Sequence, residues 1–176
     1  NPSTAPSTGT AKPTPTPCFT TKAALKAAVD SYISQGCSTN SLCEISLSWG
    51  WPIGSWCTSL ITDMSYLFQH KSGFNDDISG WNVSSVINMS YMFHNASTFN
   101  QNISKWNVGL VSDMTFMFNH AKNFNQDISG WKVASVYNMA GMFGGASAFN
   151  QDISGWNVGS VTNMFGMFFG ASAFNQ

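Results

Sequence analysis

Apolar residues recur at intervals of 25 positions from about residue 51 onwards. We use the word column for a set of residues that lie 25 positions apart in consecutive repeats. Four columns are unbroken: Trp56, Trp81, Trp106, Trp131 and Trp156; Phe74, Phe99, Phe124, Phe149 and Phe174; Met64, Met89, Met114, Met139 and Met164; and Phe68, Phe93, Phe118, Phe143 and Phe168. Because no insertion or deletion interrupts them, they predict units that stack around one continuous core.

Two apolar patterns alternate within one unit, residues 74–98. Ile78, Trp81 and Val83 predict a short strand, with the Trp and Val side chains pointing inward. Apolar residues from Val86 to Phe99 then recur every three or four positions, which predicts a short helix or 3-10 turn. The sequence therefore predicts a leucine-rich-repeat-like solenoid, with one short parallel strand and one short helix or 3-10 turn in each 25-residue coil.

Two polar columns have structural interpretations. One column follows the predicted helical segment and contains residues that tolerate a positive φ angle, so we expect left-handed caps there. Its members are His70, Asn95, His120, Gly145 and Gly170. The other is an unbroken asparagine column, which we expect to satisfy backbone groups from coil to coil. Its members are Asn75, Asn100, Asn125, Asn150 and Asn175.

The chain divides into three predicted regions. Residues 1–17 are a Pro/Thr-rich tail or linker, because their composition cannot form a core. Residues 18–50 are a helical cap that contains cysteines, with a helix that starts after Thr20 or Thr21 and stops at Gly36. Residues 51–176 are the solenoid of about five repeats.

All four cysteines, Cys18, Cys37, Cys43 and Cys57, lie in the first third of the chain. An even set in one segment predicts two disulfides, and disulfides indicate a secreted or cell-surface protein. Three pairings remain open. Zinc binding is the alternative, but the spacings include no CxxC motif.

The composition argues against several functional classes. Charged residues make up 9% of the chain and the net charge is −1, so a basic surface for nucleic acid is absent from the sequence. No apolar run is long enough to span a bilayer. No catalytic or nucleotide-binding motif appears, so we expect no enzyme activity and no cofactor, with an enzyme kept only as a minority alternative.

Two sets of residues are alternative metal ligands. The column of Asp77, Asn102, Asp127 and Asp152 could bind calcium, although polar turn residues are the simpler interpretation. His70, His94 and His120 are the only histidines, and we expect them to be too widely spaced for a metal. The sequence therefore predicts no metal site.

Four N-x-Ser sequons cluster around one repeat, at Asn82, Asn88, Asn95 and Asn102. Asn82 and Asn95 are the better candidates for N-glycosylation, because the first should point outward and the second should lie in a turn. Coincidence in a repeat rich in Asn and Ser is the alternative. The outward-facing column of the predicted strand is polar, which makes it a weak binding face. It consists of Asn82, Asn107, Lys132 and Asn157.

The segments FNQDIS, GWNV, VTNM and MF within residues 149–176 resemble the BspA-like surface-protein repeats found in mycoplasma-type lipoproteins and secreted microalgal proteins. The resemblance covers about residues 51–176, and the preceding helix with WPIGSW resembles the lead-in to such arrays. It implies a leucine-rich-repeat-like fold and a secreted or cell-surface location. It implies no catalytic activity, and adhesion is associated with some members.

Two functional hypotheses follow. In the first, the protein is extracellular and structural, and copies of it join end to end into a filament or surface layer. The expectation rests on the low charge and on a sequence that stops in mid-repeat at Gln176, which would leave an uncovered coil. In the second, the protein is an adhesion module that binds extracellular protein or glycan ligands through a face of the solenoid.

Overall fold

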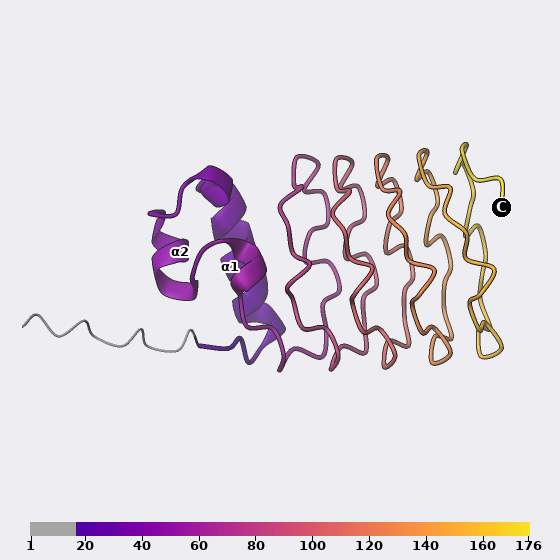
Figure 1. Ribbon diagram of the computed structural model, residues 1–176, viewed down its shortest axis with the longest axis horizontal. Helices are drawn as coiled ribbons and strands as arrows, with labels where there is room; N and C mark the ends of the chain where they lie inside the picture. The colour runs from indigo at the N-terminus through magenta and orange to yellow at the C-terminus, as the bar shows by residue number, and fades with distance from the viewer. Residues whose placement is uncertain (1–16) are drawn as a thin grey trace, which may run out of the picture.

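The computed structural model describes residues 17–176, so the predicted tail at 1–17 falls almost entirely outside the described residues. Two helices and two short 3-10 turns form the first part of the described chain: α1 (Lys22–Ser34), η1 (Cys37–Thr39), α2 (Glu44–Trp49) and η2 (Ile53–Ser55). The 25-residue repeats follow and stack side by side, with α1 against the first of them (Figure 1).

The predicted helix at the start of the cap is confirmed as α1. Thr21 provides the N-cap, because its side-chain oxygen accepts a hydrogen bond from the backbone N–H of Ala24 at 3.2 Å. The buried residues of α1 lie on one face at helical spacing: Leu25, Ala28, Val29 and Tyr32. Gly36 then adopts a φ of 65°, which ends the helical segment as expected.

Contacts of three kinds hold α1 against the first repeat. Lys22 pairs with Asp63 at 3.1 Å, and Lys71 of the first repeat pairs with Asp30 of α1 at 2.7 Å. The ring of Tyr32 meets that of Trp56 edge-on, with centroids 5.6 Å apart. The apolar face of α1 thus continues the core of the repeats.

The four cysteines form two disulfides, Cys18–Cys57 and Cys37–Cys43. The structure therefore selects one of the three pairings that the sequence left open. It also rules out the zinc alternative for these residues, since their sulfurs are bonded to each other. The longer bridge joins the start of the described chain to the first repeat, and a parallel β-bridge and a backbone hydrogen bond from Phe19 to Cys57 reinforce it.

The predicted leucine-rich-repeat-like architecture is wrong. Residues 17–176 contain no strand and no helix within the repeats, and only isolated parallel bridges connect one repeat to the next. These bridges link Asp63, Asn88, Asp113, Asn138 and Asn163. The segment around Ile78–Val83, predicted to be a strand, forms turns, and the segment after Val86, predicted to be helical, carries the bonds between repeats.

The hydrogen bonds of the backbone explain the difference. The N–H groups of Met89, Tyr91 and Phe93 donate to carbonyls of the next repeat, at 2.8–3.0 Å. Met92 and His94 alternate with these residues, and their N–H groups donate to the carbonyl of the residue three positions earlier, within turns of the same repeat. A helix needs every N–H to donate four residues back, so this alternation prevents one.

Left-handed residues also prevent a strand in this segment. Tyr91 has a φ of 57° and Asn95 a φ of 58°, and the equivalent positions of the other repeats are left-handed too. An extended strand requires strongly negative φ angles throughout, so the pairing between repeats cannot extend beyond single bridges. The predicted left-handed column at His70 is confirmed, whereas the one at Tyr91 was not predicted.

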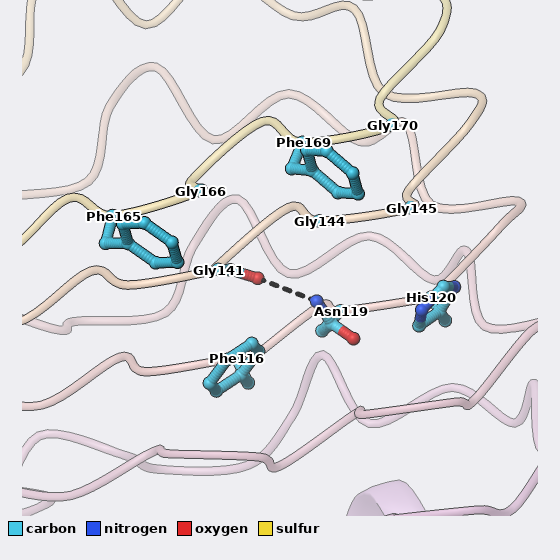
Figure 2. A pocket seen from close by; sticks show the side chains of 10 residues that line it. All are labelled: Phe116, Asn119, His120, Gly141, Gly144, Gly145, Phe165, Gly166, Phe169 and Gly170. Carbon is cyan, nitrogen blue, oxygen red and sulfur yellow. Dashed lines mark hydrogen bonds between the residues drawn. The ribbon is translucent and has the colours of Figure 1, made fainter.

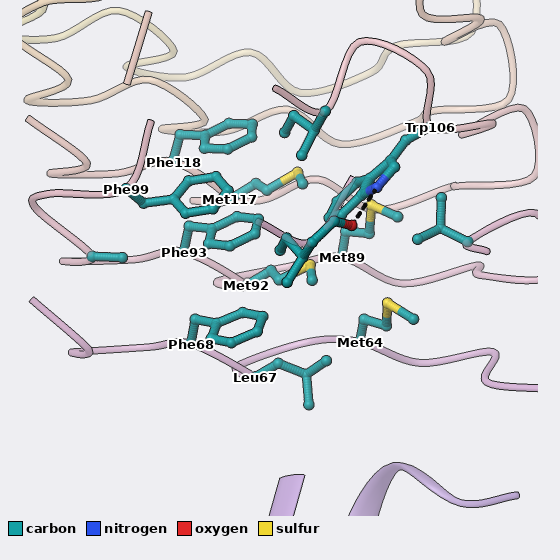
Figure 3. Close-up of a cluster of buried hydrophobic side chains, with 14 of the residues drawn as sticks. Met64, Leu67, Phe68, Met89, Met92, Phe93, Phe99, Trp106, Met117 and Phe118 are labelled. Atoms are coloured by element: carbon teal, nitrogen blue, oxygen red, sulfur yellow. Dashed lines mark hydrogen bonds between the residues drawn. The ribbon is translucent and has the colours of Figure 1, made fainter. Parts of the chain in front are cut away.

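The aromatic columns form the centre of the core. Rings of the column that contains Phe93 stack nearly parallel, with centroids 5.4–5.7 Å apart from Phe68 to Phe168. Figure 3 shows the first three of these rings, Phe68, Phe93 and Phe118. Each tryptophan from Trp81 onwards donates its indole N–H to a carbonyl of the preceding repeat, as Trp106 does to Ile78 at 3.3 Å. Trp81 and Val83 are buried and Asn82 is exposed, as the apolar pattern predicted.

The asparagine column satisfies backbone groups from repeat to repeat, as expected. The side-chain oxygen of Asn75 accepts from the N–H of Asn100 at 2.8 Å, and Asn100 does the same for Asn125 at 2.9 Å. The pattern continues to Asn175. A polar ladder thus connects the repeats beside the apolar core.

Candidate recognition groove

An aromatic column runs along the surface of the first three repeats. Tyr66 and Tyr91 stack with ring centroids 4.9 Å apart, and Phe116 follows Tyr91 at 5.1 Å. All three residues have positive φ angles, between 51° and 65°. Large side chains rarely adopt this backbone conformation, so the stacked fold must hold it in place.

Glycine replaces the aromatic residue of this column in the next two repeats, at Gly141 and Gly166. The ring of Phe116 leans towards Gly141 and occupies the space where a Cβ at that position would lie. Asn119 and His120 lean towards Gly144 and Gly145 in the same way. Side chains of the third repeat therefore depend on the glycines of the fourth.

Two phenylalanines appear where the other repeats have small or polar residues. Phe165 belongs to the column of Ser65, Ser90, Thr115 and Ala140, and Phe169 belongs to the column of Gln69, His94, Asn119 and Gly144. Both rings are highly exposed, at 85% and 84%. The fourth and fifth repeats therefore lack the aromatic ring of the column that contains Phe116. The fifth repeat instead carries two rings, Phe165 and Phe169, in two other columns.

Together these changes create a surface cavity of about 450 Å³, which we call the glycine groove. Phe116, Phe165 and Phe169 line its sides (Figure 2). Its floor consists of five glycines: Gly141, Gly144, Gly145, Gly166 and Gly170. Such a volume fits a drug-sized molecule or a few side chains of a protein partner.

Polar atoms of the groove lie along one edge. Asn119 donates its side-chain N–H to the carbonyl of Gly141 at 3.2 Å. His120 lies beside it and is exposed. No charged residue lines the groove, so its chemistry suits an apolar, flat group with few polar atoms.

The three histidines cluster beside this edge. The ring centroids of His70 and His94 are 5.3 Å apart, and those of His94 and His120 are 6.4 Å apart. Asn95 donates to Nδ1 of His70 at 3.3 Å and to Nε2 of His94 at 2.8 Å. Burial lowers the pKa of His94, and the neighbouring His70 and His120 lower it further.

The other polar columns have structural roles. Asp77, Asp127 and Asp152 each accept a hydrogen bond from the backbone N–H of the serine two residues later, at 2.8–2.9 Å. Asn102 does the same for Ser104. These bonds confirm the interpretation of this column as turn residues. Within residues 17–176 no group of three or more His, Cys, Asp or Glu is placed to hold a metal ion.

The predicted strand-face residues Asn82, Asn107, Lys132 and Asn157 are exposed in one column, but on turns and not on a strand. The side-chain oxygens of Asn82, Asn107 and Asn157 accept backbone N–H groups two residues later. None of the four lines the glycine groove. The structure therefore gives this column a role in the turns.

The sequons differ in the environment of their asparagines. Asn82 and Asn102 are exposed, and the serine hydroxyl of each sequon donates to the asparagine oxygen at 2.7 Å. Asn95 uses its side-chain N–H groups to bind His70 and His94. Asn88 forms bridges to both neighbouring repeats, and Ser90 of its sequon is buried. Asn82 and Asn102 are therefore the accessible pair.

The glycine groove could have been found in the sequence. Gly141, Gly166, Phe165 and Phe169 all depart from their columns within two adjacent repeats. Such departures indicate a local change of surface in a repeat that is otherwise uniform.

The family model described as "Mycoplasma protein of unknown function, DUF285" matches residues 40–136 and 106–176. The chain belongs to this family. DUF285 membership confirms the resemblance to mycoplasma-type BspA-like repeats at the level of the family. No curated protein and no solved structure matches the chain. None of the helices within residues 17–176 has the length and apolar character that a bilayer-spanning segment needs.

Proposed function

We propose that this protein is an extracellular recognition module that binds a partner in the glycine groove and catalyses no reaction. The groove itself is the observation that carries the proposal. It combines three aromatic side chains with a floor of glycine backbone, and aromatic residues with few polar groups are typical of binding sites. The function is therefore adhesion. The binding surface is the glycine groove and not the polar column that begins with Asn82.

Two further features support this proposal. The two disulfides are typical of proteins that fold in an oxidising compartment. We therefore propose that the protein is secreted or lies at the cell surface. Within the family, we assign it to the secreted type that its lead-in helix resembles. The groove has one titratable side chain, His120, whereas acid–base and nucleophilic catalysis need paired groups.

A structural protein that assembles end to end is the second candidate. The bonds between repeats are backbone bonds of the same kind at every junction, so one repeat can pair with an equivalent repeat of any chain. However, α1 lies against the outer edge of the first repeat and is fixed there by Lys22 and Asp30. Growth through that edge would require α1 to move, so we favour the recognition function.

Arrays of extracellular matrix proteins and glycans, probed with the purified chain, test the recognition function. The double variant Phe165→Ser/Phe169→Gln restores the residues that the first repeat has in these columns, Ser65 and Gln69. We expect it to lose the interactions of the wild-type chain, because it removes two sides of the groove.

The double variant Leu60→Ser/Leu110→Ser is the matched control. Both leucines are exposed, and serine occupies their column at Ser85, Ser135 and Ser160. We expect this control to bind like the wild type. If the Phe165→Ser/Phe169→Gln variant retained every interaction, the groove would not be the recognition site.

A further inference from the structure

We infer that Asn82 and Asn102 are N-glycosylation sites, each of which carries an oligosaccharide on its side-chain nitrogen Nδ2. The inference rests on the extracellular location that we propose, because N-glycans are added to chains in the secretory pathway. It does not depend on the glycine groove. The structure divides the four sequons of the chain into two that suit a glycan and two that do not.

The two asparagines are held at the surface by the residues that follow them. Asn82 and Asn102 are exposed, whereas Val83 and Ile103, the middle residues of the two sequons, are buried in the core. The buried side chain anchors each turn, and the asparagine points away from the core. A glycan is bulky and hydrophilic, so it can extend from such a position into solvent without disturbing the packing.

Each of these sequons forms a turn through its own polar groups. The side-chain oxygen of Asn82 accepts hydrogen bonds from the backbone N–H of Ser84 at 3.0 Å and from its hydroxyl at 2.7 Å. Asn102 accepts the same two bonds from Ser104, at 3.0 and 2.7 Å. These bonds use the oxygen and not Nδ2, which is the atom to which a glycan is joined.

The turn brings together the two groups that define a sequon, the amide and the hydroxyl. Its hydrogen bonds are local, because they join residues only two positions apart. Such turns form from the side chain and its own backbone without help from the rest of the fold. They are therefore available in a nascent chain before the repeats stack.

The modification needs an oligosaccharide donor linked to a polyprenyl diphosphate. A bond forms between Nδ2 of the asparagine and the anomeric carbon of the first sugar, while the bond between that carbon and the diphosphate oxygen breaks. Nδ2 loses one proton, and the diphosphate leaves with the bonding electron pair. The transfer involves no oxidation or reduction, and the serine hydroxyl is not consumed.

The sequon at Asn95 is unsuitable because its Nδ2 is already in use. This nitrogen donates to Nδ1 of His70 at 3.3 Å and to Nε2 of His94 at 2.8 Å. A sugar would replace one of its hydrogens and push the two histidine rings away. We therefore expect a folded chain to carry no glycan at Asn95.

The sequon at Asn88 lies at the junction between repeats. Asn88 forms parallel bridges to Asp63 and Asp113, and Ser90 of its sequon is buried. A glycan at this position would stand against the stacked backbones of three repeats. We therefore expect that the folded chain carries none at Asn88 either.

Other repeats contain the same turns with one sequon residue missing. Asp127 occupies the column of Asn102, is exposed and accepts the backbone N–H of Ser129 at 2.9 Å, so Asp127→Asn completes a sequon in an equivalent turn. Asn107 occupies the column of Asn82 and accepts the backbone N–H of Gly109 at 3.2 Å, so Gly109→Ser completes another. If the turn is what admits a glycan, each substitution should add one.

The composition of the chain supports the same inference. Only 9% of the residues are charged and the net charge is −1, so charge contributes little to the solubility of the protein. Two hydrophilic glycans would supply solubility instead. Neither Asn82 nor Asn102 lines the glycine groove, so neither attachment point occupies the proposed recognition surface.

Secretion of the 176-residue chain from a eukaryotic cell line, directed by a heterologous signal peptide, tests the inference. Peptide mass spectrometry before and after treatment with peptide-N-glycosidase identifies each occupied site, because the enzyme converts a glycosylated asparagine to aspartate. We expect glycans at Asn82 and Asn102 and none at Asn88 and Asn95.

Variants in both directions make the test specific. Asn82→Gln and Asn102→Gln should each remove one glycan, whereas the control Asn107→Gln, which lies in an equivalent turn without a sequon, should remove none. Asp127→Asn and Gly109→Ser should each add one glycan. Circular dichroism of every variant verifies the fold.

Each alternative result has a distinct meaning. A secreted chain with both disulfides but without glycans at Asn82 and Asn102 overturns the inference and leaves the proposed extracellular location intact. A glycan at Asn88 or Asn95 in the folded, secreted chain also overturns it, and so does the absence of any added glycan in both gain-of-site variants. A chain that stays inside the cell without its disulfides contradicts the location and the inference together. Array binding by the Asn82→Gln/Asn102→Gln variant tests the recognition function separately.

Discussion

The ring of Phe116 occupies the position where a Cβ of residue 141 would lie, so Gly141 and Phe116 fit together only because residue 141 is a glycine. Gly141 also has a φ of 60°, a conformation that side-chain-bearing residues avoid. One glycine thus allows a left-handed turn and the tilt of a neighbouring ring. The side of the glycine groove that Phe116 forms depends on this pair.

We predict that Gly141→Ala lowers the free energy of unfolding by about 2–3 kcal/mol, because it combines a left-handed alanine with a clash against Phe116. Urea unfolding monitored by fluorescence measures the change. Gly130→Ala is the matched control, since a Cβ there meets nothing within 4 Å, and it should change stability by less than about 0.5 kcal/mol. Equal effects of the two variants would contradict this account of the pair.

The central aromatic column should dominate stability. Phe118 is fully buried between Phe93 and Phe143, at centroid distances of 5.5 and 5.7 Å. We predict that Phe118→Ala costs about 3–5 kcal/mol, because it leaves a cavity in a stack shared by three repeats. The exposed Phe165→Ser should cost less than about 0.5 kcal/mol. Thermal denaturation of both variants makes the comparison.

The two disulfides should contribute unequally. Cys18–Cys57 has a sequence separation of 39, whereas Cys37–Cys43 has a separation of 6. Restriction of the unfolded chain predicts about 4 kcal/mol for the longer loop and about 2 kcal/mol for the shorter one. Paired Cys→Ser variants, one pair at a time, measure each contribution by chemical unfolding. A larger loss from the shorter bridge would show that restriction of the unfolded chain is not the main cause.

Acid should destabilise the protein through His94. Its pKa in the folded chain is lowered from 6.5, so as the pH falls below about 6.5 the unfolded state binds a proton more readily than the folded state. The stability present at neutral pH is therefore lost as the pH falls through the lowered value. Protonation also removes the acceptor that binds Asn95.

The melting temperature at about pH 7.5 and at about pH 5 measures this effect. His94→Asn is the informative variant, because Asn119 occupies the same column in the next repeat. It should reduce the difference between the two pH values. The carboxylates respond at lower pH: burial would raise the pKa of Asp63, but hydrogen bonds from Ser65 and Lys22 outweigh it and lower that pKa. A pH dependence unchanged in His94→Asn would exclude His94 as its origin.

The conformation of each repeat was harder to predict than its period. Apolar residues every three or four positions, such as Met89, Met92 and Phe93, fit a helix, but the same spacing also suits consecutive turns. Whether this segment forms a helix or consecutive turns depends on the acceptors of its alternate backbone N–H groups. Those acceptors are carbonyls of the next repeat. No single repeat carries that information in its own pattern.

The sequence by itself determined the 25-residue period, the buried aromatic columns, the helix that became α1 and the left-handed column at His70. These features depend on local backbone preferences or on the burial of apolar side chains, and both follow directly from residue type and spacing. The tertiary structure alone decided the disulfide pairing, the absence of strands from the described repeats and the fit of Phe116 against Gly141. Each of these depends on contacts between residues of different repeats or distant segments, which form only when the chain stacks.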